Sequence, residues 1–154
     1  MSEISYSDGL SVETQILADL KTQTVFDSAT SVLSQKYGES WPHEYHLSAT
    51  RGNLLRHLDW SGLSVLELGA GMGAVSRVLS EQAQNLTVVE GTKLRFDVLS
   101  ERLRDRKNWK GTVANIQDAV LNEKFDVVCV IGVLEYAQLY FKGEDLEPFH
   151  AFLQ

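Results

Sequence analysis

The sequence predicts an α/β fold in which a doubly wound, mostly parallel sheet follows a helical N-terminal extension. From residue 64 to residue 131, short apolar runs alternate with amphipathic segments of helical period, which is the pattern of parallel strands joined by crossover helices. The apolar run at 64–68 stops at a cluster of glycines, and an amphipathic segment starts directly after it. Glycine permits positive φ and close approach to the backbone, so this feature indicates a strand that enters a helix through a tight turn.

Composition narrows the class of protein. The 154 residues are 44% hydrophobic, enough for a core, and carry a formal net charge of −7, which argues against non-specific binding to nucleic acid or to an anionic membrane. No apolar run is long enough to insert into a membrane, and the single cysteine, Cys129, cannot form an intrachain disulfide. We therefore expect a cytoplasmic protein. The change in periodicity along the chain divides it into a helical extension over 1–60 and a core over 61–154.

The extension is expected to hold two helices. Apolar periodicity predicts the first over 13–35, with a break near 22–24, and Gly38 and Pro42 then predict a loop over 37–46. Ser48 is a suitable N-cap for a second helix through Leu58, which would bury Leu54, Leu55 and Leu58.

In the core, predicted strands alternate regularly with predicted helices. The predicted strands cover 64–68, 85–90, 111–115 and 125–131, the predicted helices cover 74–82 and 94–106, and Pro148 would begin a further helix. The basic residues near the second core helix are interleaved with acids, so we expect them on a solvated helix face. They are Arg102, Arg104, Arg106, Lys107 and Lys110.

The fourth predicted strand is apolar on both faces, as in a central parallel strand, and places Cys129 as an inert buried thiol. An uncovered apolar edge would favour aggregation. We therefore expect the sheet to be truncated after this strand, so that either a C-terminal remainder or the partner in a homodimer covers it.

Two acids accompany the glycine turn. Residues 69–74 fit a nicotinamide or flavin site as well as an S-adenosylmethionine site. Glu67, two residues before the first glycine, would accept from an ammonium group and repel a pyrophosphate; the alternative is a carboxylate that caps the nearby helix. Glu90, about twenty residues after the turn, has the spacing of an acid that binds ribose hydroxyls, and its alternative is a solvated strand end.

Four segments in order resemble class I S-adenosylmethionine-dependent methyltransferases, which have a Rossmann-like fold. Residues 65–73 resemble their glycine motif, 87–90 their acidic second motif, 114–118 the segment beside the adenine, and 125–136 the fourth-strand motif. The chain departs from the family pattern at Asn115, where Asp is more frequent, and at Tyr136, where His is frequent.

The resemblance implies S-adenosyl-L-methionine as cofactor, no metal, and a set of site residues. The implied cofactor-binding residues are Glu67, Gly69, Ala70, Gly71, Gly73, Glu90, Gly91, Asn115, Ile116, Gly132 and Val133. The candidates for a catalytic role are His46, Tyr45, Glu135 and Tyr136, with His46 or His43 as the base for a hydroxyl acceptor because the pKa of histidine lies near neutrality.

The segment 41–48, with Arg51 and residues 53–56, is similar to methyltransferase domains that accompany bacterial glycosyltransferases. In class I enzymes the N-terminal helices form a lid over the cofactor, which would bring Tyr45 and His46 to the sulfonium or the acceptor. The alternative is a packed aromatic and a surface histidine. The resemblance thus implies methyl transfer to a small-molecule or saccharide acceptor, without nucleic acid. Two alternatives remain at this level: a non-catalytic cofactor-binding or scaffold module, and a nicotinamide-dependent oxidoreductase.

Overall fold

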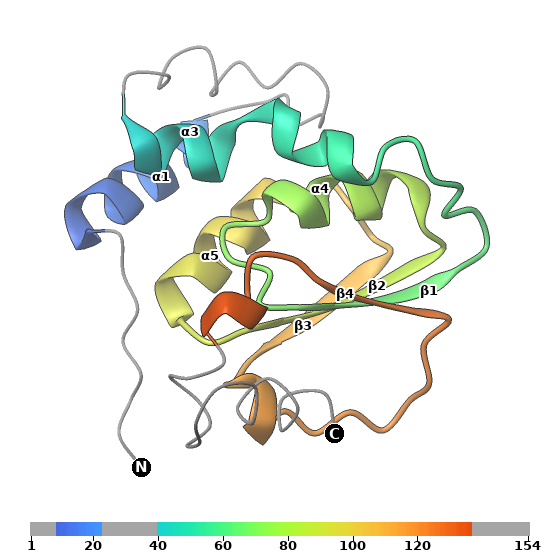
Figure 1. The fold of residues 1–154 in the computed structure, drawn as a ribbon. Coiled ribbons are helices and arrows are strands. Elements are labelled where there is room, and N and C mark those ends of the chain that lie inside the picture. The colour runs from blue at the N-terminus through green and yellow to red at the C-terminus, as the bar shows by residue number, and fades with distance from the viewer. Residues whose placement is uncertain (1–8, 23–39, 137–154) are drawn as a thin grey trace.

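The computed structural model describes residues 9–22 and 40–136 (Figure 1). Its centre is a four-stranded parallel sheet in the order β3-β2-β1-β4, which confirms the predicted α/β fold. The strands are β1 (Ser64–Leu68), β2 (Asn85–Glu90), β3 (Trp109–Val113) and β4 (Val127–Val130). The predicted helix at Pro148 and the predicted helical residues beyond position 22 lie outside the described residues.

The strand register brings the functional segments to one edge of the sheet. Leu68, at the end of β1, lies opposite Val89 of β2 and Val130 of β4. From β1 the chain proceeds on one side to β2 and β3 and later crosses to β4 on the other side, so the strand order reverses at β1. In open parallel sheets, ligands bind beyond the carboxyl ends of the strands at such a reversal.

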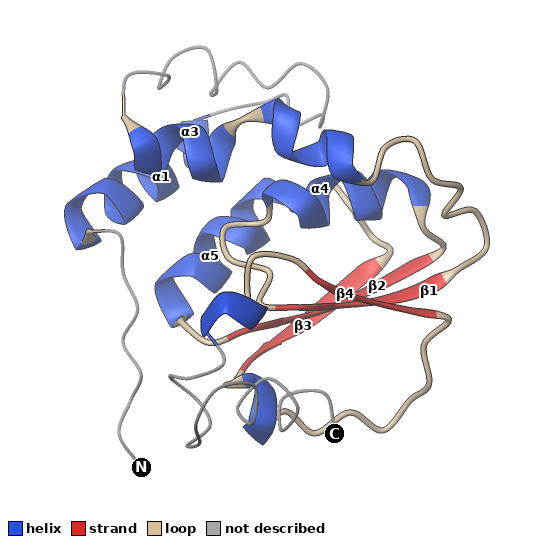
Figure 2. Cartoon of the chain, in the orientation of Figure 1, coloured by secondary structure: helices blue, strands red, loops and turns tan. Residues whose placement is uncertain are grey.

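Helices α4 (Ala74–Gln82) and α5 (Lys93–Arg102) cover one face of the sheet (Figures 1 and 2). Their apolar sides pack on β1 and β2 around fully buried side chains. Among these are Val65, Val78, Leu79, Val88 and Leu99. The predicted bounds of β1, α4 and β2 are confirmed, whereas α5 ends at Arg102 rather than residue 106 because the chain then turns back through bonds from Arg104 N–H and Arg106 N–H to preceding carbonyls.

The N-terminal elements lie beyond α4 and α5, away from the sheet (Figure 1). They are α1 (Leu10–Thr22), α3 (Trp41–Leu47) and the 3₁₀ helix η1 (Ala49–Leu54). The predicted loop over 37–46 is wrong for residues 41–46, because Pro42 occupies the first turn of α3, where its missing N–H costs no hydrogen bond.

The second predicted helix of the extension is only partly confirmed. Ser48 is an N-cap, and its hydroxyl accepts from Thr50 N–H, but the element that follows is a 3₁₀ helix that ends at Leu54. Leu55 is buried beside Trp60, while Leu54 and Leu58 are exposed, so their predicted burial is wrong. The helix stops at Leu54 and the chain turns over residues 55–58, so the helical spacing that would have put Leu54, Leu55 and Leu58 on one face is lost.

The prediction of two covered faces for β4 does not hold at Val128, whose side chain is 53% exposed. Cys129 is buried as expected, and burial raises the pKa of its thiol to about 11, so the thiol is protonated and inert at neutral pH. Among the described residues, β4 pairs only with β1 and forms an edge of the sheet.

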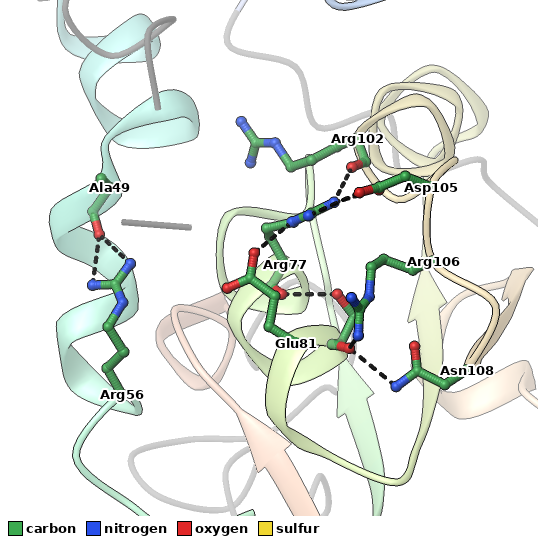
Figure 3. Close-up of polar contacts among 9 residues, drawn as sticks. Ala49, Arg56, Arg77, Glu81, Arg102, Asp105, Arg106 and Asn108 are labelled. Atoms are coloured by element: carbon green, nitrogen blue, oxygen red, sulfur yellow. Dashed lines mark hydrogen bonds and ion pairs between the residues drawn. The ribbon is translucent and has the colours of Figure 1, made fainter. Parts of the chain in front are cut away.

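Arginines join the helices to one another (Figure 3). Arg77 of α4 donates to Asp105 at 2.5 and 3.0 Å, to Glu81 at 2.7 Å and to the Arg102 carbonyl at 3.1 Å. Arg102 is itself buried and donates to the His46 carbonyl at the end of α3 at 2.8 Å. The prediction of a solvated face is therefore wrong for Arg102, which ties α5 to α3.

A buried ion pair joins α1 to α5. Arg95 donates through Nε and Nη2 to Glu13 Oε1, both at 3.1 Å, and both residues are less than 10% exposed. Removing one member of a buried pair leaves the other charge buried, which costs far more than losing a pair in water.

Glu13→Ala should therefore lower the free energy of unfolding by about 3 kcal/mol. Asp97→Ala is the matched control, because it breaks the exposed Lys93–Asp97 pair on the same helix and should cost less than about 1 kcal/mol. Urea unfolding followed by circular dichroism measures both, and equal losses would contradict a dominant role for the buried pair.

Candidate functional site

An open cavity lies at the carboxyl ends of β1, β2 and β4. Its floor is the glycine turn after β1, one wall follows β2 and β3, the other follows β4, and α3 with η1 form the roof. The side chains and backbone that line it come from all of these segments. They are Tyr45, His46, Arg51, Glu67, Gly69, Ala70, Gly71, Met72, Ala74, Val75, Glu90, Gly91, Thr92, Arg95, Asn115, Ile116, Ile131, Gly132, Val133 and Tyr136.

The three glycines of the turn have positive φ and differ in surroundings. A Cβ on Gly69 would meet the Val133 side chain at 2.4 Å, and one on Gly73 would meet Leu99 at 3.1 Å. Gly73 is the N-cap of α4 and does not line the cavity. Gly71 has φ of +56° and nothing within 4 Å of an added Cβ, so a side chain there would enter open space in the cavity.

Glu90, at the end of β2, stabilises the glycine turn through a hydrogen bond. Its Oε2 accepts from Gly71 N–H at 2.8 Å, and its Oε1 accepts from the backbone and hydroxyl of Thr92 at 2.9 and 3.0 Å. A carboxylate has about four acceptor positions, so Oε2 retains one for a ligand hydroxyl. The acid therefore shapes the turn and also faces the space above it.

Glu67 is the least satisfied acid of the cavity. It is 3% exposed, and its Oε2 has no hydrogen-bond partner among the described residues. Burial raises the pKa of its carboxyl to about 8; the Ser76 hydroxyl opposes the rise without reaching hydrogen-bond geometry, while Glu90 adds to it and Arg51 opposes it. A cationic group in the cavity could pair with the Oε2 atom of Glu67, which has no hydrogen-bond partner among the described residues.

Three polar atoms converge above Gly132, just after β4. Measured from the position of an added Cβ, Tyr45 Oη lies at 2.9 Å, Arg51 Nη2 at 3.7 Å and Glu135 Oε1 at 3.8 Å. The Tyr45 ring is held between Trp41, stacked at 4.8 Å, and the Arg51 guanidinium, 3.8 Å from the ring centroid. A Cβ at position 132 would therefore crowd Tyr45 Oη, and the φ of +70° also favours glycine there.

The opposite end of the cavity is built by Gly91, Asn115 and Ile116. Asn115 Nδ2 donates to Asp118 Oδ2 at 3.2 Å, and Asn115 Oδ1 lies 3.5 Å from the position of an added Cβ on Gly91. Asn115 precedes the 3₁₀ helix η2 (Ile116–Asp118), and Ile116 supplies an apolar wall beside it.

The structure thus brings together ten of the eleven residues predicted to bind the cofactor, with Gly73 behind the turn. Tyr45, His46 and Tyr136 line the cavity, and Glu135, in the 3₁₀ helix η3 (Leu134–Tyr136), reaches its edge above Gly132. His43 instead contacts Ser40 Oγ through Nδ1 at 2.5 Å and is not a lining residue. Their roles in binding and catalysis stay predictions.

Sequence reasoning missed several lining residues, chiefly Arg51, Thr92 and Arg95. Thr92 and Arg95 follow Glu90 closely and could have been found from the helix that begins there. Arg51 stands out in the sequence only as part of the segment that resembles other methyltransferase domains, and the folded chain places it in the cavity lining near Gly132. The described ranges contain no cluster of His, Cys, Asp and Glu that would hold a metal ion, and none of their helices is long and apolar enough to cross a membrane.

Solved structures share this fold at low sequence identity. N-methyltransferase NodS from Bradyrhizobium japonicum WM9, in complex with S-adenosyl-L-homocysteine, has a TM-score of 0.56 at 19% identity, over 92% of this chain and 64% of that one. DhpI, in complex with S-adenosylhomocysteine, has a TM-score of 0.56 at 21% identity, over 96% and 62%. Phosphoethanolamine N-methyltransferase 1 of Haemonchus contortus, in complex with phosphoethanolamine and S-adenosylhomocysteine, has a TM-score of 0.51 at 18% identity, over 78% and 24%.

The chain spans less than two thirds of the length of each of these three proteins. The likeness confirms the predicted Rossmann-like methyltransferase fold with its N-terminal helices. No curated protein matches the chain. The family described as Nodulation protein S (NodS) matches residues 53–144, which is more than half of the chain and includes the glycine turn, Glu90 and the segment after β4, so this chain belongs to the NodS family.

Proposed function

We propose that this chain binds S-adenosyl-L-methionine and serves methyl transfer to a small-molecule or saccharide acceptor. One observation carries the proposal: the open space above Gly71 is flanked by two buried carboxyls, Glu90 beside the turn and Glu67 with an unpartnered oxygen. A pyrophosphate would be repelled there, whereas a ribose and an ammonium group fit. Support also comes from the family match and from the similar structures, whose named complexes hold S-adenosylhomocysteine.

The residues present fit the parts of this cofactor in order along the cavity. Asn115 and Ile116 would hold the adenine, and the free acceptor position of Glu90 Oε2 would take a ribose hydroxyl. Glu67 would hold the ammonium group of the methionine part. Arg51, whose guanidinium stacks on Tyr45, would take the carboxylate, since a guanidinium matches a carboxylate in charge and shape.

In the reaction, the residues of this chain would align the acceptor with the cofactor, exclude water and accept one proton from the acceptor. When bound, the cofactor supplies an electrophilic methyl group on a sulfonium. Tyr45 and Glu135 lie beside Gly132, and His46 and Tyr136 line the same cavity, so an acceptor there would find groups able to accept a proton from its hydroxyl or amine. Two similar proteins are named N-methyltransferases, and one of them holds phosphoethanolamine, which supports a small acceptor.

The same proposal extends to the surroundings of the domain. It places the protein in the cytoplasm, without nucleic acid as a partner. It also includes a homodimer partner that covers β4, because Val128 of this strand is 53% exposed and β4 has one neighbouring strand among the described residues.

Gly71→Ala should weaken binding of S-adenosylhomocysteine at least about tenfold, because the added Cβ enters the space that the cofactor would occupy. Gly62→Ala is a matched control: Gly62 also has positive φ and open space around an added Cβ, but lies outside the cavity. Each variant should lose about 1–2 kcal/mol of stability from backbone strain. Titration calorimetry that finds normal affinity in a folded Gly71→Ala variant would contradict the assigned site.

Glu90→Ala should weaken S-adenosylhomocysteine binding by about 1–3 kcal/mol, the cost of losing a charged hydrogen-bond partner. Because Glu90 also holds Gly71 N–H, the variant should show reduced thermal stability even without ligand. Unchanged affinity would remove Glu90 from the site, and tight binding of NAD(H) by the wild type would overturn the methyltransferase proposal in favour of an oxidoreductase.

Cofactor affinity should rise as the pH increases from 6 towards 8. Glu67 is protonated below its folded pKa of about 8 and must lose that proton to pair with an ammonium group, so binding in this range should release a proton. Calorimetry in two buffers of different ionisation enthalpy measures the release. The folding stability of the ligand-free chain depends on pH in the opposite direction. Between pH 4.5 and about pH 8, Glu67 of the folded chain holds a proton that the unfolded chain has lost, so the free energy of unfolding falls as the pH rises.

Glu67→Gln is the control for both effects, since an amide of the same shape does not titrate in this range. It should flatten the pH dependence of affinity and of urea-unfolding stability. A wild-type affinity that is constant from pH 6 to 8, with no buffer-dependent enthalpy, would show that Glu67 does not receive the ammonium group.

A further inference from the structure

At the adenine end of the cavity, the orientation of one side-chain amide is fixed by a residue outside the cavity wall. Asn115 Nδ2 donates to Asp118 Oδ2 at 3.2 Å. An aspartate side chain at neutral pH accepts hydrogen bonds and donates none, so the amide nitrogen of Asn115 has to face it. The amide oxygen is thereby turned the other way.

That oxygen faces the cavity. Asn115 Oδ1 lies 3.5 Å from the position that a Cβ on Gly91 would occupy, and both residues line the cavity beside Ile116. Gly91 has no side chain to cover the oxygen on that side. The base-binding end of the site therefore presents a hydrogen-bond acceptor next to an apolar wall.

We propose that Asp118 is a positioning residue that makes this site select a 6-amino purine over a 6-oxo purine, by holding the Asn115 amide with its oxygen toward the base. The inference rests on the proposed cofactor function. An asparagine whose amide is free to rotate can present either an oxygen or an NH₂ group, and so can serve either purine. With Asp118 in place, a flip of the Asn115 amide would bring Asn115 Oδ1 against the Asp118 carboxylate. The flip would also break the hydrogen bond from Asn115 Nδ2 to Asp118.

The presence of asparagine rather than aspartate at position 115 also explains why a neighbouring residue such as Asp118 is needed to orient its side chain. A carboxylate at position 115 would offer only acceptors, whichever way it turned, and would select an amino group without assistance. Asn115 has a donor and an acceptor of nearly identical shape, so selection requires a neighbour that distinguishes them. Asp118 lies three residues later, within the same turn of chain that forms η2.

The test compares S-adenosylhomocysteine with S-inosylhomocysteine, which carries a 6-oxo group, by titration calorimetry. The wild type should bind the adenosine compound at least about tenfold more tightly, as expected when one polar group is mismatched. Asp118→Ala should reduce this ratio several-fold, and it should do so partly by binding the inosine compound more tightly than the wild type does. A merely structural contribution of Asp118 would weaken both ligands together.

Two further variants complete the experiment. The double variant Asn115→Asp/Asp118→Ala should regain the preference for adenosine, because a carboxylate needs no orientation. Asp59→Ala, which removes another exposed aspartate with a local bond, to Ser61 N–H, should leave the ratio unchanged. Binding of S-adenosylhomocysteine with an unchanged ratio in Asp118→Ala would overturn the inference alone, whereas no binding of either compound by the wild type would overturn the proposed function.

Discussion

The site depends on the parallel pairing of β1 with β2, which continues past the end of β1 into the glycine turn. Gly69 and Ala70 donate their N–H groups to the Val89 carbonyl at 2.8 and 3.1 Å, and Gly71 N–H then donates to Glu90 Oε2 at 2.8 Å. The turn is therefore held by the end of the neighbouring strand. These bonds fix the place of a turn whose glycines have positive φ, and they hold Glu90 beside the open space above Gly71.

The cavity wall also holds two acids, Glu67 and Glu90, that are almost fully buried. Glu90 has three donors from Gly71 and Thr92, whereas the buried Glu67 oxygen has none among the described residues. Burying a carboxylate without partners is costly, so Glu67 retains its proton and its pKa rises to about 8. The two acids come from adjacent strands of similar sequence character, and their different surroundings give them different chemistry.

The roof of the cavity is fixed by arginines rather than by apolar packing alone. Arg102 donates to one carbonyl near the end of α3, that of His46, and burial lowers the pKa of its guanidinium to about 10, which reflects the cost of placing a charge there. Arg95 holds α1 through Glu13 and lines the cavity at the same time. The position of Tyr45 and Arg51 above Gly132 thus depends on contacts made one layer away from the cavity.

The sequence alone determined the central strands, the first core helix and the position of the glycine turn, because these segments have strong periodicity and local turn chemistry. It also marked Glu67, Glu90 and Asn115, since parallel strands place their carboxyl ends at one edge. Only the tertiary structure decided that residues 41–47 form a helix, that Leu54 and Leu58 are exposed, that Arg51 lines the cavity, and that the Asn115 amide nitrogen faces Asp118. Those outcomes depend on contacts between segments far apart in sequence, or on which of two equivalent directions a side chain takes, and local pattern carries no information about either.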